Sequence, residues 1–478
     1  MYERRWYRAQ ASFARMLFLF KEENMSNFQK VKGTRDVFGE EVKRWQKIEQ
    51  LIKELCFLYG YDEFRTPEFE STEVFKREND SSDMVNKEMY TFMDQGNRSL
   101  TLRPEITAGI VRSVVENKLY ANVDLPLKYY YIASNFRAEN PQKGRYRIFH
   151  QFGVEAFGAK NPLLDLEVIT IGATLLSILG IKESKVLINT LGDEESRNQY
   201  REALKEHFAS SIDTMCADCK RRYIQNPLRI LDCKIDKDHD AMQKIPKMSD
   251  YLTEASKLYF NQIIDGLKML EIPYEIDEKL VRGLDYYTDT VFEVVSTNKD
   301  MGAQSTLFAG GRYDKLVEYF GGPEMSGIGF GLGLERLLIA LEAESISLDD
   351  EDMIDVYVLC LDEKYQKEAF ILTTLARANG YRTEMDYLGR SMKAQFKTVD
   401  RKKAQVVAIL GEDEVRLGRV TLKYIPTQEQ LSVGFDEMIA QLDAWATQEH
   451  QHEHNHECSC GHDHEDCDGE DCQCGHQH

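Results

Sequence analysis

Five arginines stand where one local sequence pattern gives way to another, and together they could hold a polyphosphate. Arg103, Arg137, Arg145, Arg282 and Arg336 each lie at the edge of a strand-like, turn-like or glycine-rich stretch. A planar guanidinium matches a phosphate in two-point contact, and phosphoryl or nucleotidyl transfer needs several such groups with Mg²⁺. Any single arginine is ordinarily a solvated surface residue, so the spacing alone leaves nucleotide chemistry as one hypothesis among others.

The nucleotide-binding loops with short signatures do not fit this sequence. It has no GxxxxGK[ST] loop, and the glycine run GIGFGLG at 327–333 contains GxGxxG only in broken register. That run also follows a stretch typical of antiparallel strands, so neither a P-loop nor a dinucleotide-binding fold is indicated. A nucleotide would therefore bind on another scaffold.

Candidate metal ligands are concentrated at the C-terminus, where residues 450–478 contain eight His and five Cys among acidic residues. Thiolates and imidazoles bind Zn²⁺, Ni²⁺ or copper well, but alternating HxHxH and CxC patterns do not fix one geometry. We expect 448–478 to be a disordered, metal-binding extension and not a catalytic site. Its candidate ligands are Cys458, Cys460, His462, His464, Cys467, Cys472, Cys474 and His476.

A second cysteine group lies within the body of the chain. Cys216-x₂-Cys219, followed by Cys233 and His239, has a partial and irregular zinc-site spacing. The alternative in this region is a basic edge, residues 220–222, that meets RNA phosphates. The net charge of −21 argues against non-specific nucleic-acid binding, but it leaves room for such a local basic surface.

The elements that would position these groups alternate as in an α+β protein. Strand-like and helix-like stretches follow one another up to about residue 192, a charged helical region with the cysteine group comes next, and strands then return. An acidic linker separates this part from a smaller α/β pattern. We expect six segments: a leader at 1–24 before a start at Met25, a core at 25–192 and 276–346, a helical insertion at 193–275, a second domain at 353–447, and the tail at 448–478.

Proline indicates an edge strand near the start of the core. The stretch 61–70 is predicted to be a short edge strand with Pro67 inside it, because proline cannot donate to a strand ladder.

The hydropathy of the sequence gives no membrane-spanning segment. No apolar run reaches the length of about 18 residues that spans a bilayer, and we expect a cytoplasmic protein without membrane contact.

Five motifs, in their order and spacing, resemble those of the histidyl-tRNA synthetase family, and the resemblance runs from about residue 30 to about residue 447. The motifs are TLRPE (101–105), NFRAENPQKGRYRIFHQFGVEAFG (135–158), RGLDYY (282–287), GGRYD (310–314) and GLGLERL (331–337). The resemblance implies a class II synthetase, with an antiparallel sheet flanked by helices, a helical insertion and an anticodon-binding domain. It also implies a homodimer built through residues 64–69, and three substrates: L-histidine, ATP with Mg²⁺, and the histidine tRNA.

The resemblance assigns the arginines to ATP. Arg137 and Arg282 would hold the α-phosphate from two sides and stabilise its charge in the transition state. Arg145 and Arg336 would hold the outer phosphates, and Glu139 would meet the adenine or its Mg²⁺-linked neighbourhood. The carboxylate of histidine is itself the nucleophile, which explains why the sequence has no Ser-His-Asp or Cys-His arrangement.

The resemblance also implies a histidine pocket and RNA contacts. The α-amino group would be bound by Glu105 and Thr107 with Gln151 nearby, the two imidazole nitrogens by Glu155 and Tyr287, and Tyr286 would form a wall. Pairing both nitrogens would reject other side chains without an editing domain. Gln142 and Lys143 would reach the acceptor end of the tRNA, and the basic stretch 389–404 is the candidate anticodon contact.

Two other functions are weighed against the synthetase. The regulatory subunit of ATP phosphoribosyltransferase is a non-catalytic relative that typically lacks the insertion and the anticodon domain and has degraded substrate motifs. This sequence has the insertion and the anticodon domain and keeps the substrate motifs intact, which favours the enzyme. A metal-buffering protein is the second alternative, and it rests on the tail alone.

Overall fold

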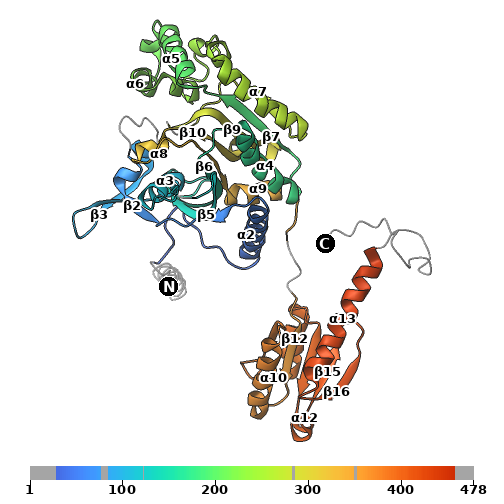
Figure 1. The fold of residues 1–478 in the computed structure, drawn as a ribbon. Helices are drawn as coiled ribbons and strands as arrows, with labels where there is room; N and C mark the ends of the chain where they lie inside the picture. The colour runs from blue at the N-terminus through green and yellow to red at the C-terminus, as the bar shows by residue number, and fades with distance from the viewer. Residues whose placement is uncertain (1–27, 77–83, 122, 283–285, 349–352, 458–478) are drawn as a thin grey trace, which may run out of the picture. The chain divides into compact units, whose positions relative to one another are not determined.

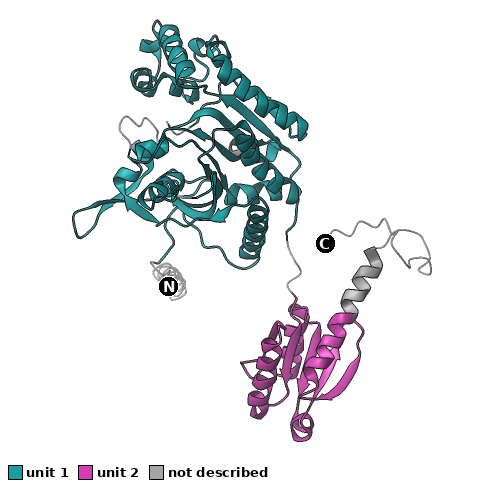
Figure 2. Cartoon of the chain, in the orientation of Figure 1, with its two compact units in different colours: residues 1–349 teal, residues 350–478 magenta. Residues whose placement is uncertain are grey.

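The computed structural model describes residues 28–76, 84–121, 123–282, 286–348 and 353–457 (Figure 1). The chain divides into two compact units at Asp349/Asp350 (Figure 2). The expected leader, and the candidate tail ligands from Cys458 onward, lie outside the described residues. Among the helices that the structure describes, none is long and apolar enough to cross a membrane.

Unit 1 is built on an eight-stranded sheet that is antiparallel in its centre and has one parallel pair at each edge. This architecture confirms the expected α+β class. In spatial order the strands are β1 (Asp62–Glu63), β5 (Leu127–Phe136), β6 (Ile148–Phe157), β11 (Gly327–Gly333), β10 (Thr306–Tyr313), β9 (Thr288–Ser296), β7 (Ser184–Thr190) and β8 (Tyr274–Ile276).

One face of this sheet is covered by the largest buried cluster. Alternate side chains of β6 and β11, including Val154 and Phe330, pack there against four helices. Successive side chains of a strand point to opposite faces, so Gln151 and Glu155 lie on the other face. The four covering helices are α2 (Glu40–Leu58), α4 (Pro162–Ile178), α7 (Glu254–Met269) and α9 (Leu334–Ala343).

The opposite face is covered only in part. Helices α3 (Thr107–Glu116) and α8 (Leu316–Tyr319) pack with Tyr131, Phe157 and Tyr313 in a smaller cluster. The rest of this face carries the polar side chains of β6 and the glycines of β11. It is the part of the fold that can receive a ligand.

The expected single strand at 61–70 is wrong in one respect. β1 ends at Glu63, and the next strand, β2 (Phe69–Ser71), belongs to a separate three-stranded sheet with β4 (Ser99–Leu102) and β3 (Tyr90–Met93). Pro67 lies in the connection between the two sheets. Its carbonyl oxygen accepts a hydrogen bond from Arg103 Nη1 at 3.1 Å.

The insertion has a small core of its own. Helices α5 (Glu194–Phe208) and α6 (Ala217–Gln225) are joined to α7 by short 3₁₀ turns, among them Pro227–Asp232. Tyr200, Phe208, Cys219, Ile230 and Cys233 belong to one buried cluster that is separate from the cluster under the main sheet.

Unit 2 is a five-stranded mixed sheet with helices, as the α/β pattern predicts. Its strand order is β13 (Thr383–Met385), β12 (Val356–Cys360), β14 (Val406–Leu410), β15 (Arg419–Tyr424) and β16 (Gln430–Gly434). Its helices are α10 (Gln366–Ala378), α11 (Met392–Arg401), α12 (Glu412–Leu417) and α13 (Met438–Glu457). The expected disorder from residue 448 onward is therefore wrong for 448–457, which continue α13.

Candidate active site

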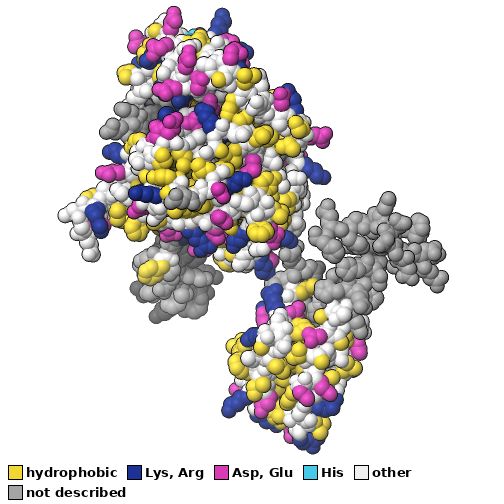
Figure 3. Space-filling model, viewed as in Figure 1, with side chains coloured by type: hydrophobic (Ala, Val, Ile, Leu, Met, Phe, Trp, Pro, Cys, Tyr) yellow, Lys and Arg dark blue, Asp and Glu magenta, His cyan; other side chains and the backbone are white. Residues whose placement is uncertain are grey.

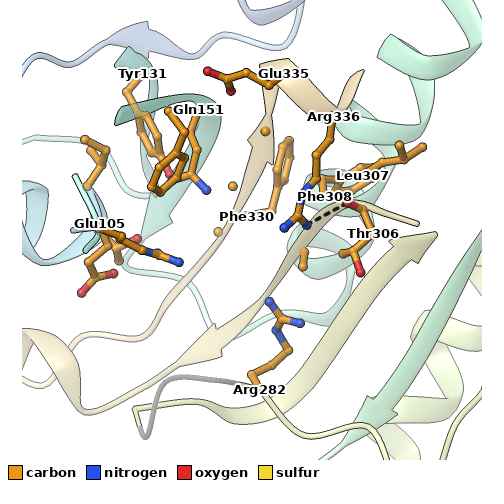
Figure 4. Close-up of a pocket in the computed structure, with 18 of the residues that line it drawn as sticks. Glu105, Tyr131, Gln151, Arg282, Thr306, Leu307, Phe308, Phe330, Glu335 and Arg336 are labelled. Atoms are coloured by element: carbon orange, nitrogen blue, oxygen red, sulfur yellow. Dashed lines mark hydrogen bonds between the residues drawn. The ribbon is translucent and has the colours of Figure 1, made fainter. Parts of the chain in front are cut away.

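Eleven of the predicted site residues line one cavity of about 220 Å³ on the open face of the main sheet. Figure 4 shows Glu105, Gln151 and Tyr131 toward one end, with Arg282 and Arg336 toward the other. The cavity thus has a carboxylate-bearing end and an arginine-bearing end. The eleven residues are Glu105, Thr107, Arg137, Glu139, Arg145, Gln151, Glu155, Arg282, Tyr286, Tyr287 and Arg336.

The glycine run of β11 forms part of the cavity floor. Its apolar residues Ile328, Phe330 and Leu332 belong to the buried cluster, so the alternating glycines face the cavity. A side chain at Gly329 would collide with the carboxylate of Glu155, and one at Gly310 with the backbone of β11. The glycine run therefore allows the side chain of Glu155 to lie directly against the backbone of β11.

Glu155 is the most deeply buried acid of the cavity and is 1% exposed. Thr107 Oγ1 donates to its Oε1 at 2.5 Å, and Tyr313 donates its hydroxyl hydrogen to Oε2. Burial raises the pKa of Glu155 to about 8, an effect that these two hydrogen bonds partly offset and the nearby Glu105 increases. The carboxyl group is therefore largely protonated at neutral pH when the cavity is empty.

Polar groups with fixed orientation surround Glu155. Tyr286 donates its hydroxyl hydrogen to Glu105 Oε2 at 3.0 Å, and Asn135 Nδ2 donates to Gln151 Oε1 at 2.6 Å. Burial raises the pKa of Tyr287 to about 12, so its hydroxyl keeps its proton and can donate or accept. This end of the cavity can pair several N–H groups and lone pairs of a small polar ligand.

The arginine end is held by backbone carbonyls and two glutamates. Arg137 Nε donates to Pro104 O at 2.9 Å, and Arg336 Nη1 donates to Thr306 O at 3.1 Å, the bond drawn in Figure 4. Arg145 pairs with Glu139 at 2.9 Å, and Arg282 pairs with Glu293. Four guanidinium groups around one space make a site for a polyanion.

Two arginines of the quoted motifs, Arg103 and Arg312, bond to other parts of the fold. Arg103 does not line the cavity, because its guanidinium donates to Ser134 O at 2.8 Å and Thr66 O at 2.7 Å. Arg312 of GGRYD is fully buried and pairs with the equally buried Asp165 of α4. Arg103 thus lies away from the cavity, and the other four arginines of that group line it.

The predicted acceptor-end residues lie beside the cavity. Gln142 and Lys143 are exposed at the tip of the turn between β5 and β6, where Gln142 and Arg145 form an isolated bridge. The next residues, Gly144 and Arg145, line the cavity. A ligand bound at the tip would thus lie next to the part of the turn that lines the cavity.

The cysteine group forms, but with a different fourth member. The Sγ atoms of Cys216, Cys219 and Cys233 and a carboxylate oxygen of Asp236 lie within 4.8 Å of one another. His239 is outside this cluster, because its Nδ1 accepts from Ala241 N at 3.1 Å and its Nε2 contacts Thr214 Oγ1 at 3.1 Å. His239, which the sequence offered as a candidate for this group, is therefore not among the four clustered donors.

The expected basic edge at 220–222 is only partly present. Lys220 is exposed, but Arg222 is buried and donates to Arg229 O at 3.1 Å. Arg222 lies three residues after the buried Cys219, on the same helix face, and this spacing in the sequence was the signal for its burial.

Sequence reasoning did not identify the residues that orient the predicted ones. Tyr313 and Asn135 contact Glu155 and Gln151 directly, and Glu293 pairs with Arg282. Tyr313 and Asn135 lie within quoted motifs, which was the available signal. Glu293 lies in the centre of β9, whereas Arg282 lies outside the strands, eleven residues earlier, so no local pattern links the two.

The fold and this divided cavity are those of a class II aminoacyl-tRNA synthetase. The family model described as "Histidyl-tRNA synthetase" matches residues 33–337, and the model described as "Anticodon binding domain" matches 355–445. The chain belongs to the histidyl-tRNA synthetase family, and its enzymatic activity is that of a histidine–tRNA ligase. Enzymes of this family use histidine, tRNA and ATP as substrates, together with Mg²⁺.

Relatives match both units of the chain. A histidine–tRNA ligase of Anoxybacillus flavithermus is 49% identical over 417 residues, which are 87% of this chain and 99% of that protein. One of Bacillus subtilis is 49% identical over 414 residues, 86% and 98% of the two chains. The crystal structure of apo S. aureus histidyl-tRNA synthetase superposes with a TM-score of 0.75 at 39% identity, covering 87% and 99%. The non-catalytic alternative is not favoured by these matches.

Proposed function

We propose that the cavity on the open sheet face binds histidine at its carboxylate-bearing end and MgATP at its arginine-bearing end. The observation that carries this proposal is that one cavity has Glu105 toward one end and Arg282 and Arg336 toward the other (Figure 4), with Glu155, Arg137 and Arg145 also in its lining. Histidine offers an ammonium and an imidazole, and ATP offers a triphosphate. Each end complements the charge of one substrate.

In the first step, an oxygen of the histidine carboxylate attacks the α-phosphorus of ATP. The new O–P bond forms as the bond to the leaving pyrophosphate breaks, which gives histidyl-adenylate. Two anionic groups must approach, so Arg137 and Arg282 would offset the charge that develops on the α-phosphate. Arg145 and Arg336 would hold the departing phosphates. Glu139 is the carboxylate on this wall that would share Mg²⁺ with the phosphates, since Mg²⁺ binds through one or two carboxylates and substrate phosphates.

Specificity for histidine would come from the paired imidazole nitrogens. Glu155 and Tyr287 would each bond one nitrogen, with Tyr286 as a wall, while Glu105, Thr107 and Gln151 meet the ammonium. A side chain without these nitrogens would leave buried polar groups unpaired, which costs several kcal/mol.

In the second step, a hydroxyl of the terminal ribose of the tRNA attacks the histidyl carbonyl and releases AMP. Gln142 and Lys143, at the exposed turn tip, would guide the acceptor end. The insertion, 193–275, would clamp the acceptor stem, and the domain 353–447 would bind the anticodon, with 389–404 as the candidate contact surface. Since its substrate tRNA serves translation, we place the protein in the cytoplasm.

A homodimer is part of the proposal. Phe69 on β2, and Phe92 and Met93 on β3, are 53%, 44% and 59% exposed, and Phe69 packs edge-on against Phe92 at 6.5 Å between ring centroids. Figure 3 shows apolar side chains gathered across the visible face of unit 1. Sedimentation velocity should give a dimer for the parent and a monomer for Phe69→Glu. Leu417→Glu, at an exposed apolar residue of unit 2, is the matched control and should remain a dimer.

The tail, 448–478, is proposed as a metal-binding extension for Zn²⁺ or Ni²⁺ that takes no part in the ligation. Deleting it should leave aminoacylation unchanged and remove most of the bound metal. Loss of charging activity on deletion would refute this division of roles.

Histidine-dependent exchange of pyrophosphate into ATP tests the residue roles. Arg282→Lys keeps the charge but loses two-point contact, and the exchange kcat should fall about 100-fold, equivalent to about 2.7 kcal/mol. Arg419→Lys, at an exposed arginine that contacts Ser432 in unit 2, is the matched control. Equal rates for the parent and Arg282→Lys would remove Arg282 from the proposed mechanism.

A further inference from the structure

The cysteine cluster of the insertion has the form of two equivalent half-sites. Cys216 and Cys219 are separated by two residues, and so are Cys233 and Asp236. In each half, the first cysteine sulfur accepts a backbone hydrogen bond from the residue three positions later: Cys219 N to Cys216 Sγ at 3.4 Å, and Asp236 N to Cys233 Sγ at 3.3 Å. Backbone N–H groups that point at ligand sulfurs orient and stabilise thiolates.

The distances within the cluster fit a tetrahedral zinc ion. Zn–S bonds of about 2.3 Å and Zn–O bonds of about 2.0 Å place two sulfurs about 3.8 Å apart, and a sulfur and an oxygen about 3.5 Å apart, at tetrahedral angles. Cys216 Sγ and Cys233 Sγ are 3.7 Å apart, and Cys233 Sγ and Asp236 Oδ2 are 3.6 Å apart. All four donor atoms lie within 4.8 Å of one another, so they can close on one centre with small side-chain rotations.

We propose that Cys216, Cys219, Cys233 and Asp236 bind a structural Zn²⁺. The ion replaces the three thiol protons, which pass to solvent, and leaves no open coordination position. The three cysteines belong to or pack against the small core of the insertion, which is separate from the main core. A small core gains more from a metal crosslink than a large one.

The two half-sites connect to the two arginines proposed to hold the α-phosphate. The Cys233 half follows the turn 227–232, where Arg229 Nη1 donates to the backbone oxygen of Arg282 at 2.5 Å. The Cys216 half includes Asp218, which pairs with Lys87 at 3.6 Å. The next residue, Glu88, accepts from Ala138 N at 2.8 Å, beside Arg137. The ion would therefore fix the segments that carry both arginines relative to each other.

The test uses the full chain in its purified form, with peptide-resolved mass spectrometry to separate this site from the cysteines of the tail. Iodoacetamide labelling of the peptides with Cys216, Cys219 and Cys233 should be slow in the untreated protein. It should become at least about 10-fold faster after a chelator removes the metal, first at the half-buried Cys216, because loss of the metal crosslink lets the small core of the insertion open. Cys56 and Cys360, which are buried elsewhere, are internal controls whose labelling should not respond to the chelator.

Zinc content gives an independent measurement. Full-length Cys219→Ser and Asp236→Asn should each contain about one Zn²⁺ per chain less than the parent, because a closed structural site needs all four ligands. The tail is identical in every variant, so its metal cancels in this difference. Cys360→Ser and His239→Ala are matched controls that should keep the parent content.

Two results would overturn the proposal. One is a disulfide between Cys216 and Cys233, seen as a mass lower by two hydrogens in the untreated protein. The other is labelling of these cysteines at one rate with and without chelator. Both measurements use only the parent protein, so the proposal can be overturned even if a variant fails to fold.

Discussion

Thr107, the first residue of α3, donates a hydrogen bond from Oγ1 to Oε1 of Glu155 in β6 at 2.5 Å. The two residues are far apart in the sequence, and both line the cavity. Tyr313 donates to the second carboxylate oxygen from β10. Helix and sheet thus fix the orientation of the most deeply buried acid, and a ligand that meets Glu155 finds it preorganised.

Glu155→Gln should weaken histidine binding without affecting ATP. The amide keeps the shape of the side chain but cannot become an anion for an imidazole N–H, and a charge-assisted hydrogen bond is lost. We expect the KM for histidine in pyrophosphate exchange to rise by about 10- to 100-fold, and the KM for ATP to stay within about twofold. An equal rise in both constants would contradict the assignment of Glu155 to the histidine end.

Glu155→Gln should also make the free protein less sensitive to alkaline pH. The pKa of Glu155 is raised from 4.5 to about 8 by burial, so the folded state binds its proton more tightly than the unfolded state. Stability therefore falls as the pH rises from about 4.5 to about 8, and it is constant outside this window. The variant lacks this contribution. Its loss of unfolding free energy between pH 5 and pH 8.5 should be smaller than that of the parent by about 3–5 kcal/mol.

Guanidinium unfolding at the two pH values measures this difference, followed by the fluorescence of Trp45 in a background in which Trp6 and Trp445 are replaced by Phe. Trp45 is buried in α2 and packs edge-on against His150 of β6, so it reports on unit 1. Other titrating groups are common to both proteins and cancel in the comparison. Parallel pH profiles of the parent and the variant would show that Glu155 ionises normally.

The sequence pointed to many residues that line the cavity, because family motifs and element patterns specify them locally. Gln151 and Glu155 lie four residues apart on one strand, so the strand period alone puts both on one face. The glycine run was interpreted as a broken nucleotide-loop pattern and as part of the GLGLERL motif, but its place in the cavity floor depends on Glu155 in the neighbouring strand. Contacts between distant strands, such as that of Tyr313 in β10 with Glu155 in β6, depend on strand register, which local patterns do not determine.

The insertion shows the same limit. The sequence showed Cys216-x₂-Cys219, followed by Cys233 and His239, only as a partial and irregular zinc-site spacing. The repeated spacing Cys233-x₂-Asp236 was present in the sequence, and the backbone places Asp236 beside the sulfurs. Equal spacing of the two half-sites was a better guide than residue type.

Gly329→Ala should impair histidine binding through the cavity floor. A Cβ at this position collides with the carboxylate of Glu155 and with the carbonyl oxygen of Val154. Glu155 must then rotate away from Thr107, and the strand pair β6–β11 must separate locally. We expect the KM for histidine to rise about 10-fold or more, since a displacement near 1 Å at a reacting site costs as much. The KM for ATP serves as the internal control, and an unchanged KM for histidine would contradict the role of the floor.

The buried pair between Arg312 and Asp165 should be worth more for stability than any surface ion pair of unit 1. Both side chains are fully buried, and Asp165 also accepts from Thr290 and from Tyr259 at 3.1 Å. Arg312→Met leaves an uncompensated buried carboxylate and should lower the unfolding free energy by about 3–5 kcal/mol. Adding Asp165→Asn should restore part of this loss, because the remaining group is neutral and keeps its hydroxyl donors.

The control is Arg98→Met, which removes an exposed pair with Asp94 and should cost at most about 1 kcal/mol. Guanidinium unfolding of the four proteins measures these changes, and a double variant no more stable than Arg312→Met would show that the charge on Asp165 is not the cause.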